Sequence, residues 1–447
     1  MPASTITLAD LAAITGPPGS DSRGAVLPAA AASRDVSIWE ITTWILPMTP
    51  EHLRRVLGQT PALPQGRAGT DGGTRWFTLT EVEILRQHFT RVAARHTGRG
   101  KLHGPVRPAG ARAPLIAVAG PLGRTGRSST VLHLACAAAL AGYKVLVLDA
   151  DPAGRLATQL GATRGTTRGA GLTPGADPTV LPLIARSCGV HLRQINVGRM
   201  DRGEPPLPMD EAIATALEQD VTALIRPTAW PGLDVIAAAP DLLLADSQMA
   251  TWRSTSRSWH PAKALATALD REGLRDRYDL ILCDTGRGLG PLVLSVLTSA
   301  DVLLIPRATA DAVRQDGAQR NDGLAPLART LQLQEAEAAM TARALGQPAV
   351  PFGWRRSVVL PIRSAPETGA IAGDQLGLAV LPHPLPYVPQ VANGQAAHLY
   401  ALDYRDTGRL IYAPLRDACD AAWRGVAAVL AGLWAEDAAS SESELPA

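Results

Sequence analysis

Residues 114–141 read PLIAVAGPLGRTGRSSTVLHLACAAALA, and this stretch decides the fold. It begins with the apolar segment 114–119, which has the composition of a buried strand. Gly120, Gly123 and Gly126 follow, and then comes an apolar run of helical length. A glycine-rich turn that leads into a helix directs several backbone N–H groups at one point, and the helix dipole adds positive potential there. The stretch therefore predicts a phosphate-binding loop between a strand and a helix.

The loop differs from GxxxxGK[ST], the common pattern of phosphate-binding loops. Pro121 stands at the first glycine, Arg127 at the lysine and Ser128 at the hydroxyl position. Taken alone, a glycine-rich turn between a strand and a helix is also compatible with a purely structural role. The residues elsewhere in the chain favour the binding role.

Short apolar segments alternate with segments of helical length after residue 114. The apolar segments are continuous rather than alternating in polarity, so we expect strands that are buried on both faces. This pattern predicts an α/β domain over residues 114–434 with a doubly wound, mainly parallel sheet. The segments expected to form strands are 114–119, 144–149, 233–239, 279–284, 301–306 and 357–362.

Three aspartates end predicted strands in the order that a nucleotide site requires. Asp149 and Asp151 lie near the end of the segment KVLVLDADP, and Asp284 is the last residue of YDLILCD. Because ligands of parallel sheets bind outside the carboxyl ends of the strands, we expect these carboxylates to converge on the loop. Mg²⁺ prefers oxygen ligands and keeps several waters, so Ser128, Asp151 and Asp284 are the candidate magnesium ligands. Each aspartate alone is equally compatible with a strand-end turn or cap.

The composition excludes several classes of protein. A chain of 447 residues with 46% hydrophobic residues, 19% charged residues and a net charge of +2 fits two ordinary domains. Its four cysteines are far apart and match no disulfide framework or zinc spacing. We find no apolar stretch of membrane-spanning length and no export signal, so we expect a cytoplasmic protein without membrane contact.

Residues 36–95 have the plan of a winged helix-turn-helix DNA-binding domain. The segment 37–45 predicts a short amphipathic helix, and Thr49 with Pro50 predicts the N-cap and first residue of a second helix. A glycine-rich hairpin and a third helix follow, the latter with Thr80-x-x-Glu83 as a capping box. The alternative is a small module for dimerisation or protein contact.

Other boundaries follow from composition. We expect residues 1–35 to form a flexible N-terminal segment, residues 96–113 a basic linker and residues 435–447 an acidic tail. On the second predicted helix, Arg54 and Arg55 are polar residues of the kind that contact phosphates or guanine edges. These two arginines are therefore candidate DNA-binding residues.

The motifs resemble those of the ParA family of partition ATPases, above all the RepA-type partition proteins of plasmids. The family motif KGGxGKTT corresponds to LGRTGRSS at 122–129, and DxDPQ corresponds to DADPA at 149–153. The family motif YDxxxxDxPPxLG corresponds to YDLILCDTGRGLG at 278–290. The segment GGTRW at 72–76 is similar to the wing of the family's winged helix, and the resemblance covers roughly residues 36–430.

This resemblance implies a P-loop NTPase fold that binds ATP with Mg²⁺ and acts as a homodimer. It gives Asp151 the catalytic role of orienting the attacking water, and it adds Arg75 of the wing to the candidate DNA contacts. It further implies DNA and a ParB-like protein as partners, and a location on the nucleoid. The residues expected to bind the nucleotide are Gly123, Arg124, Thr125, Gly126, Arg127, Ser128 and Ser129.

Several positions depart from the family pattern. Leu122 replaces the signature lysine that reaches the partner's nucleotide, Arg124 replaces the second glycine, and Arg127 replaces the central lysine. Arginine has a planar fork and does not freely replace a compact ammonium group. We therefore expect a partition protein with weak ATP hydrolysis. The alternative is a degenerate relative that acts as a DNA-binding regulator or scaffold. A metabolic enzyme is disfavoured because residues 36–95 resemble a DNA-binding domain.

Overall fold

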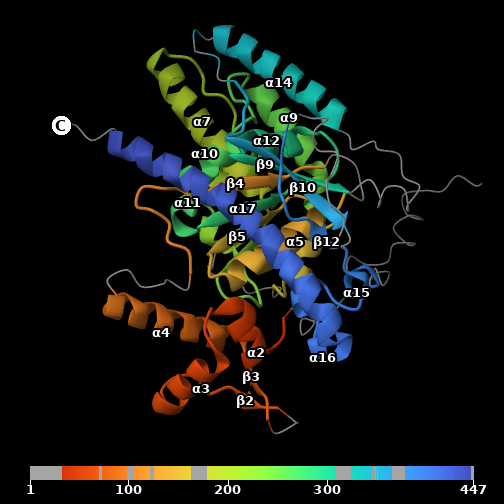
Figure 1. The fold of residues 1–447 in the computed structure, drawn as a ribbon. Coiled ribbons are helices and arrows are strands. Elements are labelled where there is room, and N and C mark those ends of the chain that lie inside the picture. Colours follow the sequence, from red (N-terminus) through yellow and green to blue (C-terminus); the bar gives the residue numbers. More distant parts are fainter. Residues whose placement is uncertain are drawn as a thin grey trace, which may run out of the picture.

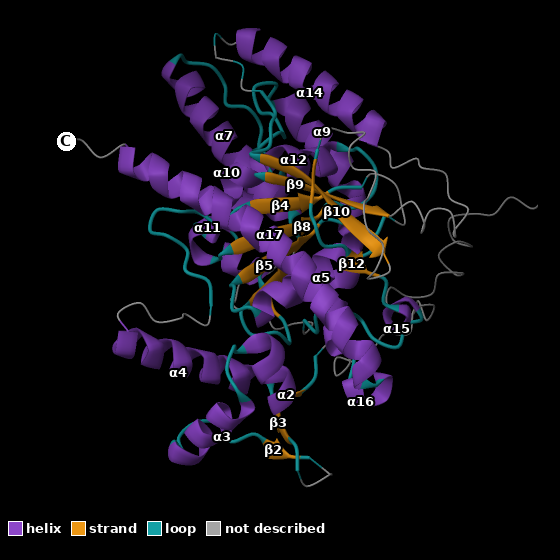
Figure 2. Cartoon of the chain, viewed as in Figure 1, coloured by secondary structure: helices purple, strands orange, loops and turns teal. Residues whose placement is uncertain are grey.

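A computed structural model describes residues 33–69, 73–97, 104–120, 125–162, 179–308, 324–344, 346, 349, 351–364 and 378–443. It has a body built around a central sheet and a smaller N-terminal part, residues 33–97, which is coloured red to orange in Figure 1. Figure 2 shows that helices cover the strands of the body from both sides.

The central sheet has nine strands and is parallel except at one edge. Its strands are β4 (Leu115–Val118), β5 (Val145–Asp149), β6 (Arg226–Pro227), β7 (Leu233–Ile236), β8 (Leu280–Asp284), β9 (Val302–Ala308), β10 (Arg356–Ser364), β11 (Ala379–Val380) and β12 (Leu385–Pro386). The order is β11-β10-β9-β4-β8-β5-β7-β6, and β12 also pairs with β10. Among the described strands of this central sheet, only β6 and β7 pair in antiparallel fashion. The predicted mainly parallel sheet is confirmed.

Successive residues of each strand contribute to apolar clusters on opposite faces of the sheet. In β4, Ile116 and Val118 belong to one cluster, whereas Leu115 and Ala117 belong to the other. This alternation follows from the two-residue period of a strand, and it explains why the strand sequences are apolar throughout. The first face is covered by α5 (Arg127–Leu140) and α17 (Arg409–Ser443).

Several of the described helices contribute to the apolar cluster on the second face, and four of them supply most of its helical side chains. They are α7 (Leu181–Asp201), α9 (Ala245–Thr255), α10 (Ala264–Arg271) and α12 (Pro291–Ser299). The remaining helices of the body are α6 (Arg155–Gln159), α8 (Glu211–Glu218), α11 (Leu274–Arg277), α14 (Leu324–Ala344), α15 (Pro389–Ala392) and α16 (Tyr404–Thr407), with 3-10 turns at Val221–Leu224, Pro240–Leu244 and Leu399–Ala401.

The N-terminal part combines three helices with a small antiparallel sheet of order β1-β3-β2. Its elements are β1 (Val36–Ser37), α2 (Ile38–Glu40) continued by a π-helix (Ile41–Ile45), α3 (Pro50–Gln59), β2 (Arg67–Ala68), β3 (Arg75–Phe77) and α4 (Leu79–Thr97). Apart from β1, which the sequence does not predict, the elements follow the predicted order of helix, helix, hairpin and helix.

Two helix starts test the predicted caps. Thr49 Oγ1 accepts a hydrogen bond from the His52 N–H at 3.2 Å, and Pro50 is the first helical residue, as predicted. The predicted capping box of the third helix is wrong by two residues. The Glu81 carboxylate accepts from the Thr78 N–H at 2.7 Å, and Thr78 Oγ1 accepts from the Glu81 N–H at 3.2 Å, so α4 begins at Leu79.

The sequence predicts residues 36–95 as a separate unit, but in the structure they share an apolar cluster with the body. Trp39 packs edge-on against Tyr404 with ring centroids 4.9 Å apart, and Trp44 packs against Tyr412 at 5.9 Å. Arg86 of α4 is buried and donates to the Leu140 carbonyl at the end of α5. The expectation of two independent cores is therefore wrong.

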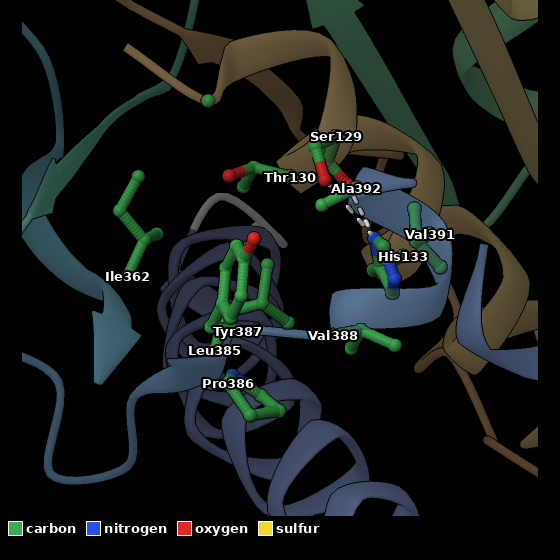
Figure 3. A pocket seen from close by; sticks show the side chains of 11 residues that line it. Ser129, Thr130, His133, Ile362, Leu385, Pro386, Tyr387, Val388, Val391 and Ala392 are labelled. Carbon is green, nitrogen blue, oxygen red and sulfur yellow. Dashed lines mark hydrogen bonds between the residues drawn. The ribbon is translucent and has the colours of Figure 1, made fainter. Parts of the chain in front are cut away.

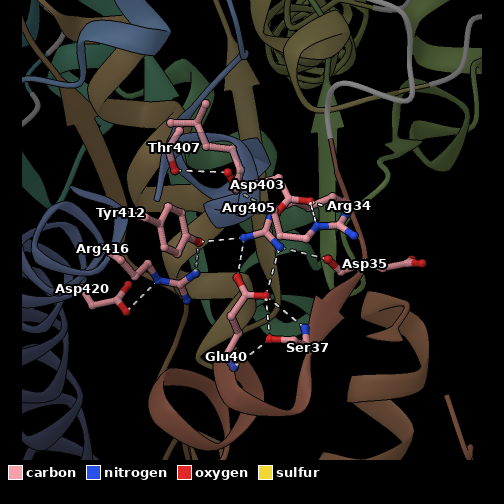
Figure 4. Close-up of polar contacts among 11 residues, drawn as sticks. Arg34, Asp35, Ser37, Glu40, Asp403, Arg405, Thr407, Tyr412, Arg416 and Asp420 are labelled. Atoms are coloured by element: carbon pink, nitrogen blue, oxygen red, sulfur yellow. Dashed lines mark hydrogen bonds and ion pairs between the residues drawn. The ribbon is translucent and has the colours of Figure 1, made fainter. Parts of the chain in front are cut away.

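A buried polar network ties the same parts together (Figure 4). Glu40 is fully buried, and Arg34 donates to both of its carboxylate oxygens. Arg34 also donates to Tyr412 Oη at 2.9 Å and to the Leu402 carbonyl at 2.6 Å. Arg34 belongs to the segment that we expected to be flexible, so residues 33–35 instead anchor the N-terminal part to α17. Residues 1–32 of that segment lie outside the described part.

The predicted linker and tail also contact the body. Arg107 donates to the carbonyls of Arg275 and Tyr278, both at 2.7 Å, so residues 104–113 of the linker are docked. Helix α17 continues to Ser443, which makes residues 435–443 helical rather than a tail. Arg355 stabilises this extension because it forms ion pairs with Glu436 at 2.9 Å and with Asp437 at 2.7 Å.

The contact between the N-terminal part and α17 depends on the negative charge of Glu40, because Glu40 holds Arg34 against Tyr412. We expect Glu40→Gln to lower the free energy of unfolding by about 3–5 kcal/mol, because it leaves a buried guanidinium without its counter-charge. Urea unfolding followed by tryptophan fluorescence measures this loss. Glu51→Gln is the control, since Glu51 is exposed and should change stability by less than about 0.5 kcal/mol. Equal effects of the two variants would contradict the role of the buried pair.

Candidate functional site

The carboxyl ends of three neighbouring strands meet at one place. In the sheet register, Asp284 of β8 lies opposite Asp149 of β5 on one side and opposite Val118 of β4 on the other. The loop that follows β4 leads directly into α5. The predicted convergence of the loop with the strand-end aspartates is therefore present in the structure.

The described part of the loop is tightly built. Gly126 precedes α5 with φ +77°, a left-handed conformation that favours glycine. A Cβ atom at Gly120 would lie 2.4 Å from Thr125 Oγ1, so the two ends of the loop are in close contact. The first N–H groups of α5, including those of Ser128 and Ser129, have no partner within the helix and face the loop end. Gly123 and Arg124, two of the predicted nucleotide-binding residues, lie outside the described residues.

Arg127 is turned inward at the centre of the site. Its side chain is only 5% exposed, and Nη1 donates to the Gly120 carbonyl at 2.6 Å. Its guanidinium lies 3.6 Å from Asp151 and 3.7 Å from Asp284, measured between nitrogen and carboxylate oxygen. Burial lowers the pKa of Arg127, and the two carboxylates oppose this effect. The arginine at the lysine position thus braces the loop and neutralises part of the carboxylate charge.

Asp149 and Asp284 form a buried acidic pair. Ser128 Oγ donates to Asp284, and Asp149 accepts backbone N–H groups of Asp151 at 3.1 Å and Leu156 at 3.3 Å. Burial, with Asp284 as the second cause, raises the pKa of Asp149 to about 8. Burial likewise raises the pKa of Asp284. At pH 7 Asp149 is therefore mostly protonated, and the buried pair does not carry two full negative charges.

Asp151 is the more accessible acid of the site, with its side chain 17% exposed. One oxygen accepts from the Ala153 N–H at 3.0 Å, and the other faces Arg127. An accessible carboxylate at this position is able to orient a water molecule. The structure thus places Asp151 beside Arg127 at the start of α5, and its catalytic role stays a prediction.

The side chains present fit a magnesium-bound nucleotide. The Ser128 hydroxyl lies in contact with the Asp284 carboxylate, and both are oxygen ligands of the kind that Mg²⁺ prefers. The raised pKa of Asp284 indicates that an added cation would stabilise its charged form. Ser128, Asp151 and Asp284 would hold Mg²⁺, and the N-terminus of α5 would hold phosphate oxygens. Within the described residues, no group of three or more His, Cys, Asp or Glu side chains is arranged to hold a metal by itself. A site that shares the ion with phosphate and water does not need one.

A cavity of about 260 Å³ adjoins the loop (Figure 3). Ser129, Thr130 and His133 of α5 form one wall, and Tyr387 stands opposite with its ring half exposed. Thr130 Oγ1 is buried and has no hydrogen-bond partner among the described residues. The cavity therefore offers an aromatic face and a polar atom beside the phosphate loop. Sequence reasoning missed the segment around Tyr387, because it carries no phosphate or metal motif.

His133 fixes one wall of this cavity. Its Nε2 accepts from the Leu399 N–H at 3.2 Å, so Nδ1 carries the proton and donates to the Ser129 carbonyl at 2.7 Å. Burial lowers the pKa of His133 and keeps the ring neutral. The first turn of α5 is thereby tied to the segment that precedes α17.

The candidate DNA-binding residues lie on the N-terminal part, away from this loop. Arg54 and Arg55 are exposed on α3, and Arg75 is exposed on β3. Arg55 contacts His52 Nδ1 at 2.9 Å, and Arg75 donates to the Gln65 carbonyl at 3.2 Å. Their side chains are available to a partner outside the chain.

The strand order, the loop before α5 and the paired strand-end aspartates define the P-loop NTPase class of proteins. A family model described as AAA domain, AAA_31, matches residues 113–337, just over half of the chain, and the chain belongs to this family. The resemblance to ParA proteins that the sequence indicates is confirmed by this match and by the named relatives.

The relatives carry partition and replication names. The chain is 25% identical over 244 residues to a replication protein A of Sinorhizobium fredii, covering 53% of this chain and 49% of the relative. It is 27% identical over 192 residues to the chromosome partitioning protein ParA of Caulobacter vibrioides, covering 43% and 55%. A solved structure titled partition protein aligns with a TM-score of 0.47 and 18% identity, covering 83% and 91%. The chain spans about half the length of the curated relatives it matches.

The turn after Asp284 packs closely against the loop that follows β5. Two glycines of this turn, one in close contact and one not, allow this packing to be tested. Gly286 has φ +72°, and a Cβ there would lie 2.8 Å from the Ala150 carbonyl oxygen. Gly288 has φ +87° but nothing within 4 Å. Each change to alanine should cost about 1–2 kcal/mol for the left-handed backbone. We expect Gly286→Ala to cost roughly a further 1–3 kcal/mol from overpacking, measured by urea unfolding. Equal losses would show that the close approach is unimportant.

Proposed function

We propose that this chain is a ParA-type partition protein that binds ATP with Mg²⁺, binds DNA and hydrolyses ATP weakly. The observation that carries the proposal is the meeting of Arg127 and Ser128 with Asp151 and Asp284 at the start of α5. The family membership and the partition names of the relatives support the same function. Homodimerisation, a ParB-like partner and nucleoid association belong to the proposal by family likeness.

Nucleotide binding rests on two adjacent features. The helix dipole and the N–H groups at the start of α5, which lack partners within the helix, attract phosphate, and Arg127 adds a charged donor. The cavity between Thr130 and Tyr387 accepts a planar base, because one wall is aromatic and another offers a hydroxyl. Magnesium would neutralise phosphate charge at Ser128 and Asp284 when it is bound.

Weak hydrolysis is expected from the way in which Arg127 is held. Its guanidinium already contacts a loop carbonyl and two carboxylates, so it has fewer donors for a transferring phosphoryl group. Leu122, which lies outside the described residues, brings no charge in place of the family's signature lysine. Loss of one well-placed stabilising contact costs about 10²–10³ in rate. These features favour slow turnover, and the second candidate function is a nucleotide-binding regulator without turnover.

Binding of ATP tests the loop directly. We expect Arg127→Ala to weaken ATP binding by at least about tenfold, because a charge-assisted contact to phosphate is lost and the acidic pair repels the nucleotide more strongly. Titration of a fluorescent ATP analogue, with and without Mg²⁺, measures the affinity, and phosphate release measures turnover in parallel. Arg202→Ala is the control because Arg202 is exposed at the end of α7. Unchanged affinity in Arg127→Ala would remove the loop from the proposed function.

DNA binding is proposed for the N-terminal part through α3 and the β2–β3 hairpin. Arg54 and Arg55 lie exposed on α3, the second helix of the N-terminal part, and Arg75 lies on the hairpin. Exposed arginines on a helix and on a neighbouring hairpin suit the groove and the flanking phosphates of duplex DNA. A dimerisation role for this part is the alternative.

Salt dependence of DNA binding tests this assignment. We expect the double variant Arg54→Ala with Arg55→Ala to bind duplex DNA more weakly and to lower the slope of log affinity against log salt by about 0.9 for each lost phosphate contact. Fluorescence anisotropy with a labelled duplex measures both quantities in the full chain. Arg424→Ala on α17 is the control, since Arg424 is exposed far along the chain from α3. A double variant with the wild-type slope would favour the dimerisation role.

A further inference from the structure

A second cavity, of about 330 Å³, lies on the face of the sheet opposite α5. Residues of α9, α12 and α14 line it, and this volume is within the range of small-molecule sites. Met249, Leu294 and Phe352 supply apolar surface. Arg253 and His260 also line it, and neither has a role in nucleotide or DNA binding as proposed above.

His260 presents a hydrogen-bond donor of defined position. Its Nδ1 accepts from the Ala262 N–H at 3.0 Å, and burial together with the charge of Arg253 lowers its pKa to about 4. The ring is therefore neutral at pH 7 and carries its proton on Nε2. This buried Nε2–H has no acceptor among the residues that the structure describes.

Arg253 presents a second donor of the same kind. Its Nη2 donates to Glu337 Oε1 at 2.7 Å, whereas its buried Nη1 has no acceptor within the described ranges. Buried donors are normally paired, because an unpaired one is costly. Two unpaired donors on side chains that line one cavity therefore indicate a ligand with an acceptor group.

We propose that this cavity binds a small carboxylate with an apolar body. A small adjustment of Arg253 and His260 lets the carboxylate accept from Nη1 and Nε2, and the apolar body packs against Met249, Leu294 and Phe352. Glu337 keeps one negative charge beside Arg253, which disfavours phosphates and other multiply charged anions. The cavity thus selects a single negative charge joined to an apolar group.

Phenylacetate and its neutral analogue phenylacetamide provide the probes. Isothermal titration calorimetry on the full chain, in the absence of nucleotide and DNA, measures the affinity of each. We expect phenylacetate to bind at least about tenfold more tightly than phenylacetamide, because only the carboxylate forms charge-assisted hydrogen bonds. Equal affinity for the two probes, or no saturable binding of either, would overturn the proposal.

Variants locate the binding. Arg253→Gln should remove the preference for phenylacetate, and His260→Phe should reduce it while keeping a ring beside Phe352. Glu337→Gln should raise the affinity for phenylacetate severalfold, since Arg253 no longer shares its charge; this gain cannot result from unfolding. Arg257→Gln is the control, because Arg257 is exposed in the same segment. Wild-type selectivity in Arg253→Gln, or no gain in Glu337→Gln, would place the binding elsewhere.

Discussion

The parallel register of β4, β8 and β5 is the constraint on which the rest of the structure depends. It places Asp149 directly opposite Asp284 at the carboxyl ends of their strands. Both side chains are buried, so their carboxylates repel each other. The first turn of α5 reduces this repulsion, because Ser128 donates a hydrogen bond to Asp284 and the guanidinium of Arg127 lies close to the same carboxylate. The loop, the acids and the start of α5 are therefore electrostatically coupled. A bound cation or a proton further stabilises the two carboxylates.

The N-terminal part and the body are joined by interactions of different kinds at two places. At α16 and α17 the joint combines edge-on aromatic rings with the buried pair of Arg34 and Glu40. At the end of α5 it uses Arg86, which donates to a carbonyl at the negative end of the helix dipole. The helix that begins at the phosphate loop thus ends against the part that carries the candidate DNA contacts.

The sequence predicts local features well and distant partnerships poorly. The continuous apolar strands and the cap at Thr49 depend only on residues that are neighbours in the sequence, so both are predicted correctly. The third helix has overlapping capping boxes, and burial of Leu79 and Val82 selects the one that starts at Thr78. That Trp39 meets Tyr404, or that Arg355 holds Glu436, depends on tertiary packing that no local pattern encodes. The inward turn of Arg127 is of the same kind, because a motif gives a residue type and not its contacts.

The contacts of Arg34 have a consequence for biosynthesis. Its bond to Tyr412 joins residues 378 positions apart, so residues 33–97 cannot complete their packing until α17 has been synthesised. Throughout that interval Trp39 and Trp44 lack the rings of Tyr404 and Tyr412, and Arg34 lacks the Tyr412 hydroxyl. Domains usually fold in the order of their synthesis. Here residues 33–97 are synthesised well before α17 but reach their final packing only with it, so part of their apolar surface stays uncovered while translation is still under way.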